Sequence, residues 1–199
     1  MIINDIKKVP KKSYYLVTID YKDYQIEELV LTKYDLYEGM EIDSKKFFQI
    51  LDESEISSGY NMAVKYLVKY VKSETEIRRY LLGKKIKSRN INIIIDKLKQ
   101  NRLINDGKMI DAILTSLILS GNGINLIRHK LYQKGFDKEL IDSKLEDLDE
   151  ELYVETINKM YEKALKRYKK YDEYVRINKV KSYLVSRGYT LSDIEKLNI

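Results

Sequence analysis

The sequence predicts a mainly α-helical protein of tandem three-helix, helix-turn-helix-like repeats in an elongated, curved array, preceded by a small β-hairpin/α extension. Apolar residues recur with helical spacing from Tyr60 onward, and the 199 residues include only one Pro and eight Gly. The chain also repeats itself after fifty positions. Seven residues of Ile77–Leu98 return as similar residues in Ile127–Leu148, and a shorter copy follows in Val180–Ile194. Repeats of this kind build extended binding surfaces and not buried catalytic pockets.

Residues 1–53 are expected to form a separate N-terminal domain. Tyr14–Ile19 is rich in strand formers and the alternating segment Tyr24–Glu27 follows a turn, which predicts a hairpin. Because a lone hairpin is marginal in water, it needs a third strand or docking on helices. A short helix is expected over Thr32–Tyr37, and Asp43 or Ser44 is expected to cap the next helix.

The first repeat is expected to span residues 60–105, after a joint at Ser54–Gly59. Its second helix is predicted to begin at a capping box, in which Ser73 is the N-cap and Glu76 reaches back. Ser88 is predicted to cap its third helix.

The second and third repeats, residues 106–152 and 153–199, are expected to follow the same order of helices. In the second repeat, Gly121-Asn122-Gly123 breaks the first helix and Ile124–Gln133 forms the second. In the third repeat, the last helix is expected to end with the chain. The expected left-handed C-caps are Gly135 and Gly188, and the expected N-caps are Asp137 and Thr190.

The net charge of +6 is distributed unevenly along the chain. Residues 1–52 hold 8 Lys/Arg against 10 Asp/Glu, whereas residues 65–108 hold 13 against 4 and residues 156–187 hold 10 against 3. An acidic helix is expected between the basic blocks, over Asp142–Glu155. Basic blocks on a modular helical body favour a polyanionic partner, although Lys-rich helices can also serve solubility alone.

The residues that catalysis or metal binding would need are scarce. The chain has no Cys, which excludes disulfides and thiolate metal sites, and its single His, His129, is expected to face solvent or an interface. No P-loop or dinucleotide motif occurs, so no cofactor, metal or enzyme activity is expected. The carboxylates of Asp142, Glu146, Asp149 and Glu150 are expected to share a solvated helix face. Without a signal-like segment or a long apolar run, a cytoplasmic monomer that does not bind membranes is expected.

The candidates for polyanion binding are cations on the second helix of each repeat and in the C-terminal basic block. Lys84, Lys134 and Arg187 recur at the end of that helix, where the helix dipole also favours cations. A row of such cations can follow a charged filament or a phosphate backbone, with binding that falls steeply with salt. The candidates are Arg78, Arg79, Lys84, Arg128, Lys130, Lys134, Lys166, Arg167, Lys169, Lys170, Lys181 and Arg187.

Several short motifs occur in a fixed order along the chain. The middle repeat fits the pattern G-P-x-x-I-x-x-x-L-x-x-K-G at Gly123, Ile127, Leu131, Lys134 and Gly135. The first repeat fits S-x-x-E-[LI]-x-x-x-L at Ser73, Glu76, Ile77 and Leu81. The ending Ser186-Arg187-Gly188-Tyr189 is similar to R-R-G-[FY], while Ile124 replaces the Pro and Lys85 stands where later repeats have Gly. Together these motifs resemble the RecX family of bacterial regulators of the RecA recombinase.

The resemblance implies binding in the groove of the RecA–single-stranded DNA filament. It implies inhibition of ATP hydrolysis, strand exchange and co-protease activity by steric and conformational means. The expected partners are the RecA filament and single-stranded or, alternatively, double-stranded DNA. Arg78, Arg79, Arg128, Lys134 and Arg187 would supply part of the contact. Reversing the charges of Arg78, Arg128 and Arg187 together is expected to abolish inhibition and leave helicity unchanged.

Two other functions remain open at this point. A direct DNA-binding regulator would place a repeat's helix in the major groove, and Ser88–Lys97 offers Arg89, Asn90 and Asn92 for base contacts. A structural adaptor would bind only protein, with little dependence on salt. Preference for one duplex sequence would support the first of these, and indifference to DNA would support the second.

Overall fold

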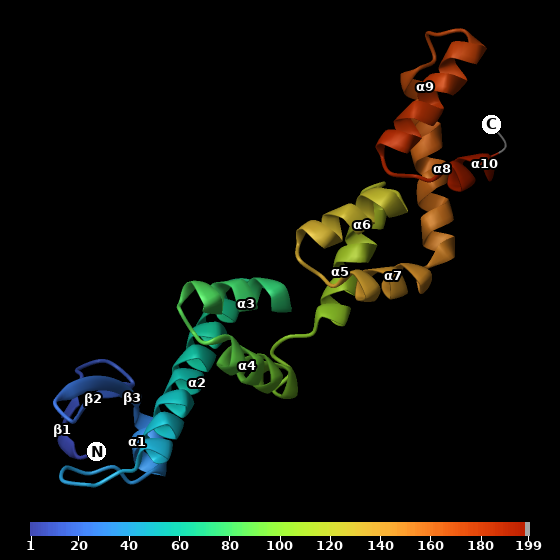
Figure 1. Cartoon of the computed structure of the whole chain (residues 1–199). Coiled ribbons are helices and arrows are strands. Elements are labelled where there is room, and N and C mark those ends of the chain that lie inside the picture. The colour runs from blue at the N-terminus through green and yellow to red at the C-terminus, as the bar shows by residue number, and fades with distance from the viewer. Residues whose placement is uncertain (198–199) are drawn as a thin grey trace. The chain divides into compact units, whose positions relative to one another are not determined.

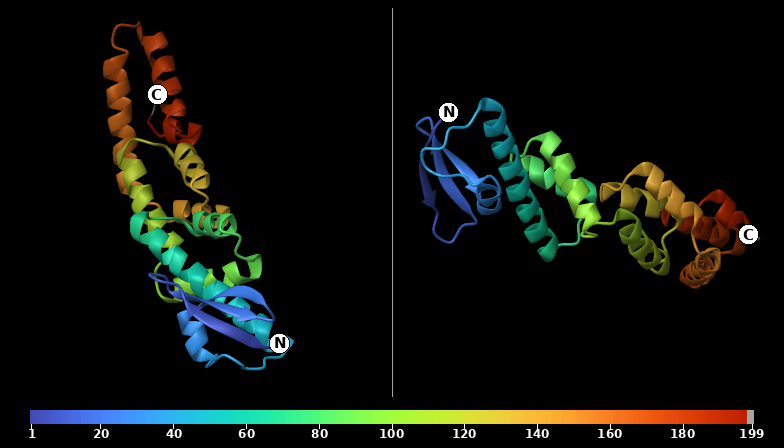
Figure 2. Two further views of the ribbon diagram at one scale, coloured as in Figure 1. Left: turned by 90° about the vertical axis from the view of Figure 1, so that its left-hand side faces the viewer. Right: turned by 90° about the horizontal axis from the view of Figure 1, so that it is seen from below.

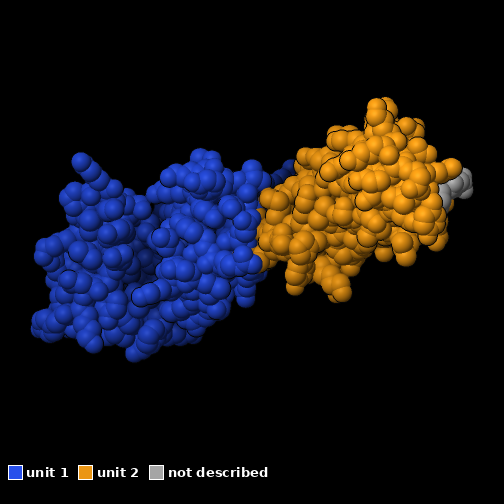
Figure 3. Space-filling model, turned by 90° about the horizontal axis from the view of Figure 1, so that it is seen from above, with its two compact units in different colours: residues 1–72, 76–104 blue, residues 73–75, 105–199 orange. Residues whose placement is uncertain are grey.

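The computed structural model describes residues 1–197, which form ten helices and one three-stranded sheet (Figure 1). The protein is therefore mainly α-helical with a small N-terminal sheet, as predicted. It divides into two compact units (Figure 3). Unit 1 comprises residues 1–72 and 76–104, and unit 2 comprises residues 73–75 and those from 105 onward. Unit 1 contains two apolar cores, one under the sheet and one among helices, and unit 2 contains one.

The sheet of unit 1 is an antiparallel meander of β1 (Ile3–Lys8), β2 (Tyr14–Ile19) and β3 (Lys22–Glu27). The predicted hairpin is confirmed, and β1 supplies the third strand that its stability requires. A two-residue turn joins β2 to β3 at Asp20 and Tyr21, whose φ angles are 45° and 64°. Two left-handed residues give a hairpin turn that matches the twist of the strands.

Helix α1 (Glu28–Lys33) follows the sheet directly, so the helix expected over residues 32–37 was placed too late. The helix ends where Asp35 takes a left-handed φ of 46° and the Leu36 amide returns to the Leu31 carbonyl at 3.1 Å. This C-terminal turn explains why the chain cannot remain helical to Tyr37.

Helix α2 (Ser44–Lys69) runs without a break through the predicted joint at residues 54–59, which is therefore wrong. Gly59 lies against α4, because a Cβ added there would be 2.6 Å from Cδ1 of the buried Ile94. Ser54 is also buried. Its Oγ accepts from the Glu27 amide at 2.9 Å and donates to the Gln25 carbonyl at 3.1 Å. Small residues at this point fix the sheet and α4 to α2 and do not form a hinge.

Two more helices follow, α3 (Glu74–Gly83) and α4 (Ser88–Gln100). Helix α3 begins directly after Ser73, as the capping-box motif predicted. The N-cap of α4 is Lys87, so the prediction of Ser88 is wrong. Lys87 makes no side-chain cap bond, and its own amide donates to Oε2 of Glu55 on α2 at 3.2 Å.

Unit 2 is helical throughout its described part (Figure 2). Its helices are α5 (Asp106–Leu119), α6 (Ile124–Gln133), α7 (Lys138–Glu146), α8 (Glu150–Arg167), α9 (Glu173–Ser186) and α10 (Leu191–Glu195). Helix α6 has the predicted bounds. Asp137 and Thr190 are the predicted N-caps, and they accept from the amides of Leu140 and Asp193, each at 3.0 Å.

Two predictions for unit 2 need comment. The acidic helix expected over residues 142–155 is wrong, because α7 ends at Glu146 and Asp149 caps α8 by accepting from the Leu152 amide at 3.0 Å. The final helix ends at Glu195, and the predicted extension to the end of the chain falls partly outside the described residues.

The second helix of every repeat ends in the same turn. The left-handed residue is Lys85, Gly135 or Gly188, with φ of 64°, 80° and 89°. In each turn the following amide returns to a carbonyl five residues earlier, which is the Schellman arrangement. These bonds are Ile86 to Leu81 at 3.2 Å, Phe136 to Leu131 at 3.4 Å and Tyr189 to Leu184 at 3.2 Å. All six side chains are buried, so the repeat seen in the sequence is also a repeat of packing.

Candidate polyanion-binding surface

Three of the predicted cations are engaged within their own repeats. Nε of Arg128 on α6 donates to Oδ1 of Asp142 on α7 at 2.9 Å. Lys130 donates from Nζ to the Asn122 side chain at 2.9 Å, and Arg78 donates from Nη1 to Oδ1 of Asn92 at 2.7 Å. These half-buried side chains first serve the packing of the second helix, which lowers their availability to a partner.

Arg187 holds together two turns of unit 2. Its Nε donates to the Gly121 carbonyl at 2.9 Å and its Nη2 donates to the Ser120 carbonyl at 2.5 Å. The Arg187 carbonyl accepts from the Gly123 amide at 2.8 Å, and the backbones of Gly123 and Gly188 pack directly against each other. Reversing the charge of Arg187 would leave the Ser120 and Gly121 carbonyls without their donors. The prediction that the triple charge reversal leaves helicity unchanged therefore no longer follows.

Three other candidates are exposed. Arg79 and Lys84 belong to unit 1, where Lys84 Nζ lies 5.5 Å from the centre of the Tyr80 ring. Lys134 belongs to unit 2, and its backbone carbonyl accepts from Ser73 Oγ at 3.0 Å while its side chain stays exposed. These cations can reach a partner without breaking a side-chain contact that supports the fold.

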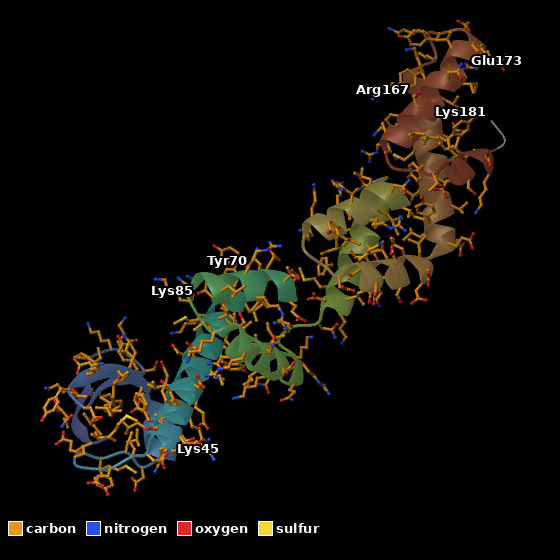
Figure 4. The ribbon with its side chains drawn as sticks, in the orientation of Figure 1. Lys45, Tyr70, Lys85, Arg167, Glu173 and Lys181 are labelled. Atoms are coloured by element: carbon orange, nitrogen blue, oxygen red, sulfur yellow. The ribbon has the colours of Figure 1, made fainter. Side chains whose placement is uncertain are left out.

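The remaining candidates lie together at the α8–α9 tip, which we define as residues 163–183. Figure 4 shows Arg167 near the end of α8 and Lys181 on α9. The tip holds eight Lys/Arg against Asp172 and Glu173. Among residues 1–197, no ion pair involves any of these eight cations. Its cations are the predicted Lys166, Arg167, Lys169, Lys170 and Lys181, and also Lys163, Arg176 and Lys179.

Tyrosine rings lie between the cations of the tip. Nζ of Lys179 and Nζ of Lys170 lie 4.6 and 5.3 Å from the centre of the Tyr171 ring. The Arg167 guanidinium lies 5.6 Å from the ring of Tyr168, and Tyr174 is 79% exposed. Cations over aromatic faces are held in place at low entropic cost while they remain open to an anion. The alternation of Tyr with Lys and Arg in residues 166–174 was the signal that counting charges alone missed.

The charge of this surface comes from its side chains. The C-terminus of α8 and the N-terminus of α9 meet at the tip, so their opposite dipole ends offset each other and the positive potential comes from the cations themselves. Asp172 is occupied as the N-cap of α9, since its Oδ1 accepts from the Val175 amide at 3.0 Å. The tip therefore combines a positive potential with the exposed Tyr174 ring and three half-buried rings, a pairing that suits a phosphate backbone and its bases.

The helix proposed for reading DNA is engaged inside unit 1. Arg89 and Asn90 on α4 both bond to Asp52 of α2, Asn90 also bonds to Glu55, and Asn92 accepts from Arg78. Burial opposes ionisation of Asp52, but hydrogen bonds from Lys87, Arg89 and Asn90 outweigh it and lower its pKa to about 2. Arg89 and Asn90 thus fix α4 to α2, and Asn92 is bonded to Arg78 of α3. These contacts speak against this helix as a reader of the major groove.

The scarce catalytic groups are placed at the surface or in structural bonds. His129 is exposed, with Nε2 at 2.9 Å from Nε2 of Gln133. Within residues 1–197, no three His, Asp or Glu side chains lie close enough to hold a metal ion together. In the same residues, no helix has both the length and the apolar character that a bilayer crossing requires.

Fold and surface define a tandem three-helix-repeat protein with a cationic, tyrosine-rich tip. The chain belongs to the RecX family. It is 30% identical to "Regulatory protein RecX" of Streptococcus sanguinis over 195 residues, which cover 96% of this chain and 74% of the relative. The protein of the same name from Listeria monocytogenes is 29% identical over 188 residues, covering 94% and 70% of the two chains. A family profile described as "RecX, third three-helix domain" matches residues 150–197, the segment that contains the tip.

Solved structures agree with this assignment. A "Crystal structure of regulatory protein RecX" is similar with a TM-score of 0.75 and 26% identity, covering 98% of this chain and 97% of the other. "Crystal structure of RecX from Lactobacillus salivarius" gives a TM-score of 0.67 and 28% identity, covering 71% of this chain and 93% of the other. The similarity therefore extends over nearly the whole fold.

Proposed function

We propose that this protein binds the RecA–single-stranded DNA filament and inhibits RecA ATP hydrolysis, strand exchange and co-protease activity. Its relatives carry the name of regulatory proteins, which supports a role without chemistry of its own. The observation that carries the proposed contact is the α8–α9 tip, where the eight cations form no ion pair with any described residue and tyrosine rings lie between them. Neutralising phosphates with such cations releases counterions and makes binding sensitive to salt.

The proposed mechanism is steric and conformational. The tip contacts the nucleoprotein surface, and exposed cations elsewhere, such as Arg79, Lys84 and Lys134, add weaker contacts. Contacts to several protomers of one filament are multivalent, so several contacts of modest affinity together give strong overall binding. Arg78, Arg128 and Arg187 act mainly by keeping the repeats in shape, which separates a structural set of cations from a binding set.

The experiment compares two triple variants with the same change in net charge. Lys166→Glu/Lys169→Glu/Lys170→Glu alters the tip, and Lys11→Glu/Lys12→Glu/Lys45→Glu alters exposed positions of the N-terminal part. Co-sedimentation with RecA on single-stranded DNA and inhibition of its ATP hydrolysis are measured for both. The tip variant is expected to bind at least about tenfold more weakly, whereas the control stays near wild type. Equal inhibition by both variants would show that the tip does not make the contact.

A further inference from the structure

Helices α6 and α7 of the middle repeat (Figure 1) line an open surface hollow of about 360 Å³, separate from the α8–α9 tip. Its floor is the buried Ile141 and the Arg128 side chain, which Asp142 holds in place at 2.9 Å. Four side chains from the two helices form its rim, and all four residues are exposed to solvent. The rim residues are Asn125, His129, Tyr132 and Lys138.

The rim differs from the same place in the other repeats. Tyr132 is 64% exposed, and its equivalents Leu82 and Val185 are exposed aliphatic residues. The equivalents of Lys138 are Ser88 in the first repeat and Leu191 in the third. Among the three repeats, only the middle one combines an exposed aromatic ring with a cation at this position. The hollow is therefore a local specialisation of the repeat and not a property of the fold.

The chemistry of the rim fits one nucleotide of an unpaired strand. An exposed tyrosine face can stack on any base, and the Asn125 side chain, which has no partner among the described residues, can donate to and accept from a base edge. Lys138 can contact the adjoining phosphate. An acidic peptide would use the cations but would leave the ring and the amide without a role. Bases within a duplex are already stacked on one another and cannot reach the ring.

We propose that the hollow between α6 and α7 binds one nucleotide of single-stranded DNA, with its base stacked on Tyr132 and its phosphate at Lys138. This inference rests on the proposed function in one respect, because the nucleotide would come from the single-stranded DNA of the RecA filament. The contact itself needs no RecA, so it can be measured on the free protein.

The test compares two labelled oligonucleotides of about 16 nucleotides, oligo(dT) and an abasic strand of equal length, by fluorescence anisotropy at several salt concentrations. Wild type is expected to bind oligo(dT) about tenfold more tightly than the abasic strand, which offers phosphates without bases. Tyr132→Leu installs the residue of the first repeat. It should reduce this preference severalfold, since the rings of the tip remain, and leave affinity for the abasic strand unchanged. Lys138→Ser should retain the preference and reduce the slope of log affinity against log salt by about 0.7.

Tyr37→Leu is the matched control, because Tyr37 is 59% exposed and lies in unit 1. It should keep the full preference for oligo(dT). A Tyr132→Leu variant that keeps the full preference of wild type would overturn the proposal. Equal binding of both strands by wild type would overturn it as well. If Tyr132→Leu then also lost RecA inhibition, the hollow would hold a protein side chain instead of a base. Failure of wild type to inhibit RecA would refute the proposed function and leave the oligonucleotide comparison intact.

Discussion

Arg128 on α6 and Asp142 on α7 form an ion pair of 2.9 Å that joins the second and third helices of the middle repeat. Fifty residues earlier, Arg78 makes the corresponding contact with Asn92 at 2.7 Å. The recurrence shows that arginine at this position is part of how the repeat is built. A loss of activity after its substitution would therefore report on the fold before it reports on a binding site.

A charge swap tests the Arg128–Asp142 pair. Arg128→Glu places two carboxylates together and should lower the free energy of unfolding by about 1 kcal/mol, a modest value because both side chains are more than a third exposed. Adding Asp142→Arg should restore most of this loss. Urea unfolding of wild type, both single variants and the double variant gives the coupling energy. A double variant no more stable than Arg128→Glu would show that the pair contributes nothing.

Arg187 should matter more for stability than its exposure suggests. Arg187→Ala removes charged donors from the Ser120 and Gly121 carbonyls and should cost about 2 kcal/mol. Lys134→Ala, at the equivalent place in the middle repeat, should cost about 0.5 kcal/mol, since its side chain is exposed. Urea unfolding of the two variants measures the difference. Equal losses would mean that the Arg187 contacts are not made in solution.

Lys85→Gly should stabilise the protein. Lys85 has a φ of 64° in a turn whose equivalents are Gly135 and Gly188, and a left-handed backbone costs a side-chain-bearing residue about 1–2 kcal/mol. Glycine removes this strain but gains entropy in the unfolded chain, so a net gain of about 0.5–1 kcal/mol is expected. Thermal unfolding is the measurement, with Lys85→Ala as the control that retains the strain. Equal melting temperatures for both variants would argue against the turn geometry.

Gly123 should not tolerate a side chain. A Cβ at this position would collide with the backbone of Gly188 and Tyr189, so Gly123→Ala should cost at least about 2 kcal/mol. Gly83→Ala is the matched control. Nothing lies within 4 Å of its added Cβ, and alanine should be neutral or stabilise α3 by up to about 1 kcal/mol. Circular dichroism during urea unfolding distinguishes the two, and a harmless Gly123→Ala would refute the close approach of the two turns.

Asp52 should make stability fall at acid pH. Its pKa in the folded protein is about 2, below the value near 4 of an unfolded chain, so the folded state binds the proton less readily. The stabilisation is complete above about pH 4 and is lost as the pH falls through 2, with a total on the order of 2 kcal/mol. Urea unfolding between pH 5 and 2 should show a smaller decline for Asp52→Asn than for wild type. Parallel declines would exclude Asp52 as a source of the effect.

Elements fixed by local chemistry were predicted well from the sequence. The bounds of α6 follow from Gly123 before it and the left-handed Gly135 after it, and Asp137 and Thr190 are short side chains that cap their own helices. The errors have distant causes. Gly59 was predicted to lie in a joint, but it packs against Ile94, which is 35 residues later in the chain. Ser88 was predicted as a cap from its residue type, but the helix start is also held by Glu55, which approaches from another helix.

The candidate surface was predicted in part for the same reason. Composition identified the basic segment that became the α8–α9 tip, since all its cations are close in sequence. Composition could not separate cations that are free of ion pairs from cations that support the fold. The acceptors of Arg187 lie 66 and 67 residues away, and the partner of Arg128 lies on the next helix. The contribution of tyrosine was missed because ring placement over Lys170 and Lys179 depends on how α8 and α9 pack.

The most direct measurement is ATP hydrolysis by the cognate RecA on single-stranded DNA, titrated with this protein at a low and a high salt concentration. A filament regulator with a cationic contact should suppress hydrolysis at substoichiometric protein, with an effect that weakens at high salt. Unchanged hydrolysis at low salt, in samples where the protein is bound to DNA, would contradict regulation of RecA and leave direct DNA binding as the function of the tip.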